Sequence, residues 1–170
     1  MSAMYAATFT GTITNAGGTV DLGSFSPADD TPIRLRGFLL SQISEVGDAM
    51  EEGLRITVNR LPATMTVGSG GSAITATKPL GDFRGGTVWA MTARANDTTP
   101  ATSSGTLEVL QEIGWNERNS PYDFFYPDER FCPSISQSAA LLTGITITQQ
   151  TTAADDYSGL FTFWIEELSG

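Results

Sequence analysis

The stretch from Ile33 to Arg60 contains two runs in which apolar and polar residues alternate, and these runs constrain the fold more than any other part of the chain. The apolar positions of the two runs are Ile33, Leu35, Phe38, Leu40, Leu54, Ile56 and Val58. Most of the positions between them are arginine, threonine or asparagine. Because side chains alternate between faces along a strand, each run predicts a β-strand with one apolar and one polar face.

Five further segments predict strands for the same reason. They are Tyr5–Thr14, Thr19–Leu22, Thr87–Arg94, Thr106–Trp115 and Leu141–Thr148, and Tyr157–Leu168 closes the chain as one more. Glycine, proline and aspartate separate these segments, as expected of turns. About eight to ten antiparallel strands without a convincing helix predict an all-β fold, namely a jelly-roll β-sandwich. A chain of 170 residues is expected to form one domain, residues 1–170.

Two of the predicted strands depart from simple alternation. In Thr106–Trp115 we expect one face to carry Leu107, Val109, Ile113 and Trp115. Leu110 and Gln111 interrupt that pattern, and a β-bulge is one cause of such an interruption. In the closing strand Phe161, Phe163 and Ile165 share one face, yet Leu160 and Trp164 make the opposite face apolar as well. A strand that is apolar on both faces is either sandwiched within the protomer or buried in a subunit interface.

The segment Asn116–Pro133 is the least regular part of the chain and the richest in aromatic residues. Its aromatic members are Tyr122, Phe124, Phe125, Tyr126 and Phe131. A segment this aromatic is expected to bury part of its area, either in its own core or against a partner.

Composition removes several classes of function. The chain has no histidine, which excludes the Ser-His-Asp and Cys-His catalytic arrangements and every histidine metal site. The single cysteine, Cys132, permits no intrachain disulfide and reads as a small buried hydrophobe rather than a nucleophile. A formal net charge of -10 disfavours binding to nucleic acid or anionic lipid. No apolar run reaches the ~18 residues that a membrane span needs.

Clustered carboxylates are the remaining places where chemistry could occur. Four acidic residues near one another could gather around a hard cation: Glu45, Asp48, Glu51 and Glu52. The pairs Asp29–Asp30 and Asp155–Asp156 could serve in glycoside hydrolysis if the fold set them ~5 to ~9 Å apart. A solvated acidic loop and ordinary turn chemistry explain these positions equally well. We therefore expect no enzyme, no catalytic residue, no metal and no cofactor.

Two segments carry a resemblance to known proteins. Residues 42–56, together with the Gly68–Ser72 loop and Pro79–Leu80, resemble small structural proteins encoded beside the major capsid protein of tailed bacteriophages. The ending Asp156–Leu168 is similar to the closing strand of tumour-necrosis-factor/C1q-type jelly rolls, in which a Ser-Gly step leads into alternating aromatic and aliphatic residues.

This resemblance implies a head decoration, or cement, protein that is made in the host cytoplasm and resides on the outer surface of the virion. Its expected partners are two further copies of itself, in a homotrimer, and the major capsid protein. Near the threefold axis we expect Trp115, Phe161, Phe163, Trp164 and Ile165. Against the capsid we expect Tyr5, Phe9, Tyr122, Phe124, Phe125, Tyr126 and Phe131.

Two other functions stay open on the sequence. A receptor-binding head domain of a trimeric phage fibre would have the same β-rich composition, and binding to host cells rather than to capsids would distinguish it. A carbohydrate-binding or carbohydrate-cleaving β-sandwich would present exposed tryptophan and tyrosine platforms. A melting temperature that depends on added sugar would distinguish that class.

Overall fold

A computed structural model describes residues 2–14, 18–43, 53–78, 89–116, 121–138, 141–151 and 156–168. The prediction of an all-β fold is confirmed. Within these residues the single helical element is η1, Glu129–Phe131, a 3₁₀ turn that Asp128 caps by accepting a hydrogen bond from the Arg130 amide.

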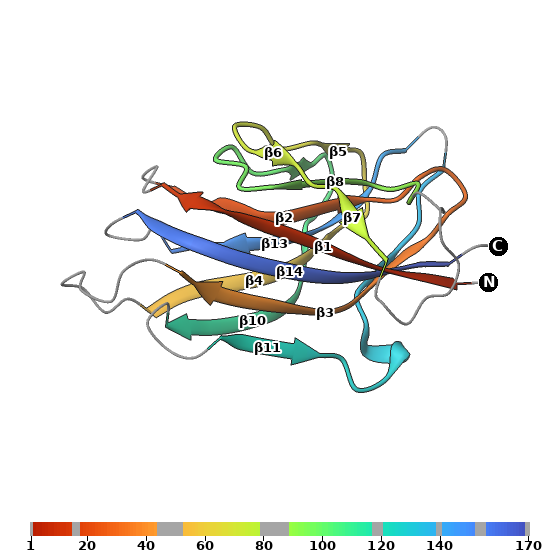
Figure 1. The fold of residues 1–170 in the computed structure, drawn as a ribbon. Coiled ribbons are helices and arrows are strands. Elements are labelled where there is room, and N and C mark those ends of the chain that lie inside the picture. Colours follow the sequence, from red (N-terminus) through yellow and green to blue (C-terminus); the bar gives the residue numbers. More distant parts are fainter. Residues whose placement is uncertain are drawn as a thin grey trace.

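Eight strands form the body of the molecule (Figure 1). They are β1 Ser2–Ile13, β2 Val20–Ser26, β3 Ile33–Gln42, β4 Gly53–Leu61, β10 Glu108–Asn116, β11 Tyr122–Phe125, β13 Gly144–Gln149 and β14 Tyr157–Leu168. In chain order the first of these pairs with the eighth, the second with the seventh, the third with the sixth and the fourth with the fifth, all antiparallel. This nested pairing is the jelly-roll topology, so the predicted β-sandwich is the fold.

The strands divide into two facing sheets. Sheet A has the order β11-β3-β14-β1-β7, with β12 also on β3, and sheet B has the order β10-β4-β13-β2-β8-β6. The short strands are β6 Ser72–Ala73, β7 Ala76–Thr77, β8 Thr92–Ala95 and β12 Ser134–Ile135. A separate pair, β5 Met65–Thr66 and β9 Thr102–Ser103, lies outside both sheets.

The core fills the space between the sheets, and phenylalanine dominates its centre. Phe25 of sheet B meets Phe163 of sheet A edge to face, with ring centroids 5.2 Å apart. Gly23 makes room for this contact, because a Cβ atom there would lie 2.7 Å from the Cζ atom of Phe163. Phe38 and Phe161 are fully buried beside them. The alternating residues that the sequence assigned to one face of β1, β3, β4 and β14 therefore supply the interior.

Bulges decide which residues face inward in two strands. In β3 the register against β14 shifts between Trp164 and Ile165, which leaves Arg36 without an opposite residue. Because of this extra residue, the large inward-facing residues of β3 are odd-numbered up to Leu35 and even-numbered from Phe38 onward. In β10 the predicted bulge at Leu110 is confirmed by a register shift between Val109 and Gln111.

The β10 bulge also corrects one face assignment. Leu107 and Val109 were expected to share a face with Ile113 and Trp115, but Val109 is 48% exposed whereas Ile113 and Trp115 are buried. One inserted residue reverses the alternation beyond it, so the apolar residues before the bulge point outward.

Several predicted strands have different boundaries, and three of them illustrate the differences. The Thr87–Arg94 strand is β8, which begins at Thr92, and residues 79–88 lie outside the described part of the chain. The Thr19–Leu22 strand extends through Ser26 as β2. The Leu141–Thr148 strand begins at Gly144, as β13.

Candidate functional site

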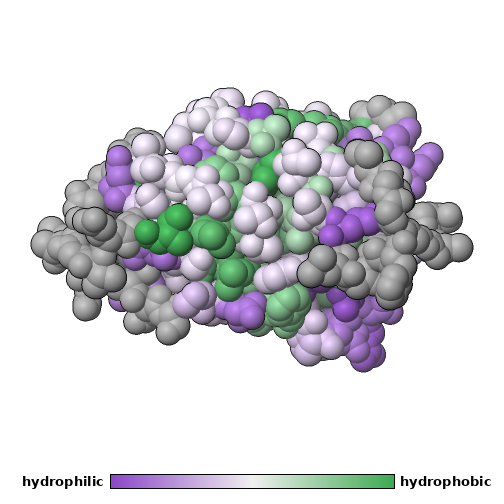
Figure 2. All heavy atoms as spheres, viewed as in Figure 1, coloured by the Kyte–Doolittle hydropathy of each residue, from purple (hydrophilic) through white to green (hydrophobic). Residues whose placement is uncertain are grey.

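The outer face of sheet A carries an apolar stripe that nothing in the described chain covers. Its members come from three adjacent strands, and they are Leu39 and Ile43 at β3, Phe125 of β11, and Leu160 and Trp164 of β14. All five are partly or largely solvent-exposed, and Phe125 is 52% exposed. Figure 2, in the view of Figure 1, shows apolar residues that extend from the left part of this face to its middle. We call this set the sheet-A stripe.

A glycine lets the two aromatic members of the sheet-A stripe meet. Gly37 lies opposite Phe125 on one side and Trp164 on the other, so the three form one cross-strand row. With no side chain between them, the two rings approach to 4.4 Å between centroids at an interplanar angle of 35°. The result is a tilted aromatic pair beside Gly37, with the Phe125 ring against the glycine.

Replacing Gly37 by alanine is expected to dislodge this pair and lower the free energy of unfolding by about 1–3 kcal/mol. The new Cβ atom would lie 2.5 Å from the carbonyl oxygen of Phe124 and 2.8 Å from Cδ1 of Phe125. Gly114→Ala in β10 is the matched control, because a Cβ there meets nothing within 4 Å. Urea denaturation of both variants checks the prediction, and equal effects would contradict it.

Polar groups flank the sheet-A stripe on both sides. At one end, Arg34 binds Glu129 with 2.8 Å between Nη1 and Oε2, and it lies 3.4 Å from Glu166. Arg36 lies 3.7 Å from the same Glu166 oxygen. On the other side β1 presents a row of threonines, of which Thr8 contacts Thr162 at 3.2 Å between hydroxyl oxygens. The stripe is therefore an apolar centre within a polar, internally paired rim, which is the usual composition of a protein interface.

The five residues expected near a threefold axis separate in the structure. Trp115, Phe161, Phe163 and Ile165 are buried in the core of the protomer, so they offer no surface to another subunit. Trp164 alone lies on the outer face. We expected Phe161, Phe163 and Ile165 to form the exposed face of β14. In the structure these residues face inward, and the outer face of the strand carries Leu160 and Trp164 instead.

Most of the residues expected against a capsid are also used internally. Tyr5 is buried, and Phe9, Tyr122, Phe124 and Tyr126 are partly buried and pack on the core. The two exceptions are Phe125, in the sheet-A stripe, and Phe131, which is 67% exposed. The alternation of β11 places Phe124 inside and Phe125 outside, so neighbouring aromatics have opposite environments.

Phe131 belongs to a second apolar area at the edge of the sandwich, formed by β10 and η1. Leu110 and Phe131 line the same groove, and Leu107 and Val109 are exposed just before Leu110 in the chain; we call these four residues the edge patch. The groove has a volume of about 430 Å³ and is lined by Leu110, Phe131, Cys132 and their neighbours. The nearby arginines are paired, since Arg60 binds Glu108 at 2.6 Å and Arg130 binds Asp128 at 3.0 Å. The edge patch is thus apolar and locally neutral on a strongly acidic protein.

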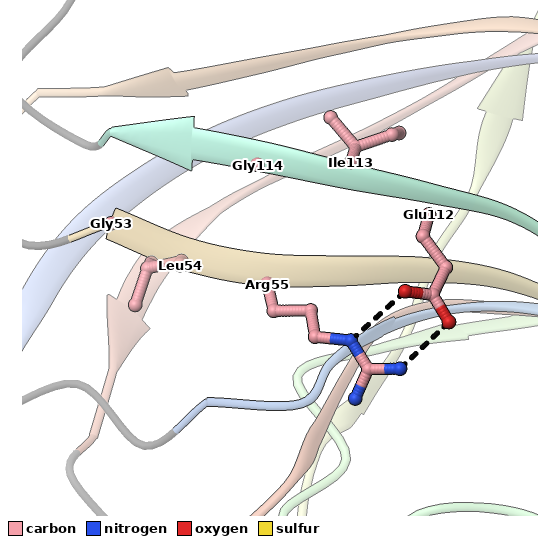
Figure 3. Close-up of a pocket in the computed structure, with 6 residues that line it drawn as sticks. All are labelled: Gly53, Leu54, Arg55, Glu112, Ile113 and Gly114. Carbon is pink, nitrogen blue, oxygen red and sulfur yellow. Dashed lines mark hydrogen bonds and ion pairs between the residues drawn. The ribbon is translucent and has the colours of Figure 1, made fainter.

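A smaller hollow of about 320 Å³ lies over the end of β4 and β10 (Figure 3). Arg55 and Glu112 point toward each other across it and form two hydrogen bonds, at 2.7 and 3.2 Å. Those bonds lower the pKa of the Glu112 carboxyl and raise that of Arg55. Both side chains are more than half exposed, so this pair is an ordinary surface ion pair and marks no reactive centre.

The side chains considered for chemistry are dispersed. Cys132 is buried, and its burial raises the pKa of the thiol. Both observations agree with a buried hydrophobic residue rather than a nucleophile. Asp29 and Asp30 lie exposed in a loop. The acidic set Glu45–Glu52 and Asp155 lie outside the described residues. Within the described part, no three His, Cys, Asp or Glu side chains are placed to hold a metal ion.

Three members of the sheet-A stripe, Leu39, Ile43 and Leu160, were not predicted as site residues. The signal for Leu39 was present, because it stands between Phe38 and Leu40 in an unbroken apolar triplet. Such a triplet makes both faces of a strand apolar, which needs a second covering surface.

Among the residues that the structure describes, no helix is long and apolar enough to cross a membrane. Comparison with known proteins finds no matching family model, no matching curated protein and no matching solved structure.

Proposed function

We propose that this protein is a non-enzymatic decoration, or cement, protein, which assembles as a homotrimer and binds the outer surface of a tailed-phage capsid. The observation that carries the proposal is the sheet-A stripe, an apolar face in the middle of a sheet with no cover in the described chain. The resemblance of residues 42–56 and 156–168 to phage structural proteins and to a trimeric jelly-roll ending supplies the identity of the assembly.

Two unlike apolar areas favour a ring over a twofold dimer. In a cyclic trimer one surface of each subunit contacts a different surface of the next, whereas a twofold dimer uses the same surface twice. The sheet-A stripe lies on a sheet face, and the edge patch lies on the β10–η1 edge. Each copy therefore offers two candidate partner surfaces for a closed ring.

Charge also favours neutral contacts. Two bodies that each carry a net charge of -10 repel each other unless their contact surfaces are free of unpaired acid. Around the stripe and the edge patch the arginines are matched by carboxylates, as the Arg34–Glu129 and Arg60–Glu108 pairs show. Association through these two areas would bring mainly apolar groups and paired charges into contact, with the exposed Asp123 of β11, opposite Leu39, as an acid beside the stripe.

The mechanism in this proposal is additive binding energy. A trimer that touches several capsid subunits gains avidity, because each contact after the first is intramolecular. The shell would then withstand internal pressure, heat or osmotic shock better than a shell without the protein. No bond is made or broken in the process.

The test is to add the purified protein to empty heads assembled from its own phage's major capsid protein. We expect co-sedimentation with the heads and an increase in the temperature at which they rupture. The Leu160→Glu variant should do neither, while Val67→Glu, which changes an exposed apolar residue outside both areas, should behave as wild type. Heads that neither bind the protein nor gain stability would remove the proposal.

One observation favours a carbohydrate-binding sandwich as a second candidate. The Phe125–Trp164 pair is a partly exposed aromatic platform with Asp123, Arg36 and Glu166 close by in the same sheet. Aromatic platforms bearing polar neighbours also bind sugars. A saturable shift in melting temperature with added oligosaccharide, lost in Trp164→Ala, would support this candidate over the capsid.

A further inference from the structure

Residues 97–101 and the β5–β9 pair form a layer of chain against sheet B, because the Ala101 amide binds the carboxylate of Asp21 in β2 and Met65 of β5 lies against Ser26 of β2 and Gly144 of β13. Two carboxylates at this contact have almost no solvent exposure, since Asp21 of β2 is 1% exposed and Asp97, at the start of the layer, is 0% exposed. Buried carboxylates are costly unless each is matched by a cation or by hydrogen bonds. Their surroundings therefore determine how firmly the layer is held.

Asp21 joins the layer to two strands of sheet B. Its Oδ2 accepts a hydrogen bond from the Ala101 amide at 2.7 Å, and its Oδ1 accepts one from the Thr148 hydroxyl of β13 at 2.6 Å. Its backbone also exchanges two hydrogen bonds with the backbone of Asp97, at 3.0 and 3.1 Å. Asp21 is thus the point at which the layer is fastened.

Asp97 fastens the other side of the same layer. Its carboxylate receives Arg94 through both Nε and Nη2, the shortest contact being 2.7 Å, and accepts the Gly71 amide at 3.0 Å. Arg94 of β8 is the cation at this contact, and its guanidinium is bound to Asp97. Two other side chains lie close to Asp21. They are Thr148 of β13, which is neutral, and Asp97 after β8, which is charged.

Two buried carboxylates therefore share one guanidinium, which leaves the charge of Asp21 without a cationic partner among the described residues. We infer that Asp21 and Asp97 form a proton-dependent latch, which holds the covering layer on sheet B tightly when Asp21 is protonated and more loosely when it is ionised. This inference does not depend on the oligomeric state or on the proposed function.

The direction of the effect follows from the environment of Asp21. Burial, and to a smaller extent the neighbouring Asp97, raises the pKa of the Asp21 carboxyl from 3.8 to about 6, against the opposing hydrogen bonds from Thr148 and Ala101. When the layer opens, Asp21 meets water and its pKa returns toward 3.8. The closed form therefore binds more protons between about pH 4 and pH 6, and opening becomes easier as pH rises through that window.

The test is hydrogen exchange of the Ala101 amide, which donates directly to Asp21. After correction for the intrinsic exchange rate, we expect the opening equilibrium of wild type to rise about 50-fold from pH 4 to pH 6.5 and to level off above about pH 7. Asp21→Asn keeps the shape and an acceptor for Ala101 but cannot ionise, so its opening equilibrium should be flat over that range once other titrations common to both proteins are subtracted.

A second variant tests the same latch through the pH at which the opening equilibrium levels off. Thr148→Val removes the hydroxyl that lowers the pKa of Asp21, so opening should level off at a higher pH than in wild type. A purely structural role for Asp21 would leave that pH unchanged. A wild-type opening equilibrium that is flat between pH 4 and 6.5, or that changes equally in Asp21→Asn, would overturn the latch.

Discussion

Replacing Phe163 by alanine is expected to lower the free energy of unfolding by about 3–5 kcal/mol, which is a large share of the stability of a domain this size. Phe163 is fully buried on the central strand of sheet A, where it fills the space above Gly23 and meets the ring of Phe25. Alanine would leave a cavity that the stiff neighbouring strands cannot close.

Urea denaturation of wild type, Phe163→Ala and Phe163→Leu at one protein concentration measures this effect. Leucine fills most of the space, so its cost should be well below that of alanine. A cost below about 1 kcal/mol for alanine would mean that sheets A and B do not meet at Phe163.

Replacing Leu160 by glutamate is expected to leave the fold intact and to weaken self-association at least about 100-fold. Leu160 lies on the outer face of β14, so a charge there stays in water in the free protomer. In an assembled trimer the same charge would be buried in an apolar contact without a partner, which typically costs several kcal/mol. The change therefore acts on assembly and spares folding.

Trp164→Ala should weaken association through a different route, by deleting the largest side chain of the sheet-A stripe. Val67→Glu is the control, because Val67 is 38% exposed and belongs neither to the stripe nor to the edge patch. Sedimentation of the four proteins over a range of concentrations measures the association constants. Equal association of Leu160→Glu and wild type would show that the stripe is not the interface.

The alternation of apolar and polar residues in the sequence predicts the β-sandwich fold. It does not predict which face of each strand is exposed. It identified β1, β3, β4 and β14, because each has a strict apolar row that must face the interior. It did not show which row of β14 faces inward, since both rows contain large apolar residues. Pairing with β1 and β3 and the position of sheet B decide that, and they depend on residues far apart in sequence.

Bulges and buried carboxylates were harder to foresee, for two physical reasons. One extra residue in β10 reverses the facing of Leu107 and Val109, and the sequence shows only a break in the pattern. Asp21 falls within the predicted Thr19–Leu22 strand and Asp97 in a polar stretch where aspartate is common, so neither position predicts burial. Their burial follows from a covering layer that comes from another part of the chain and has no regular pattern of its own.

The mass of the protein in solution tests most directly whether the sheet-A stripe is a self-association surface. Light scattering or sedimentation equilibrium at micromolar concentration should give three times the protomer mass of 18.1 kDa for wild type and for Val67→Glu. It should give a single protomer for Leu160→Glu with an unchanged circular dichroism spectrum. A wild-type protein that stays at 18.1 kDa up to about 100 μM would contradict the proposal, because the stripe would then be bare in the free protein.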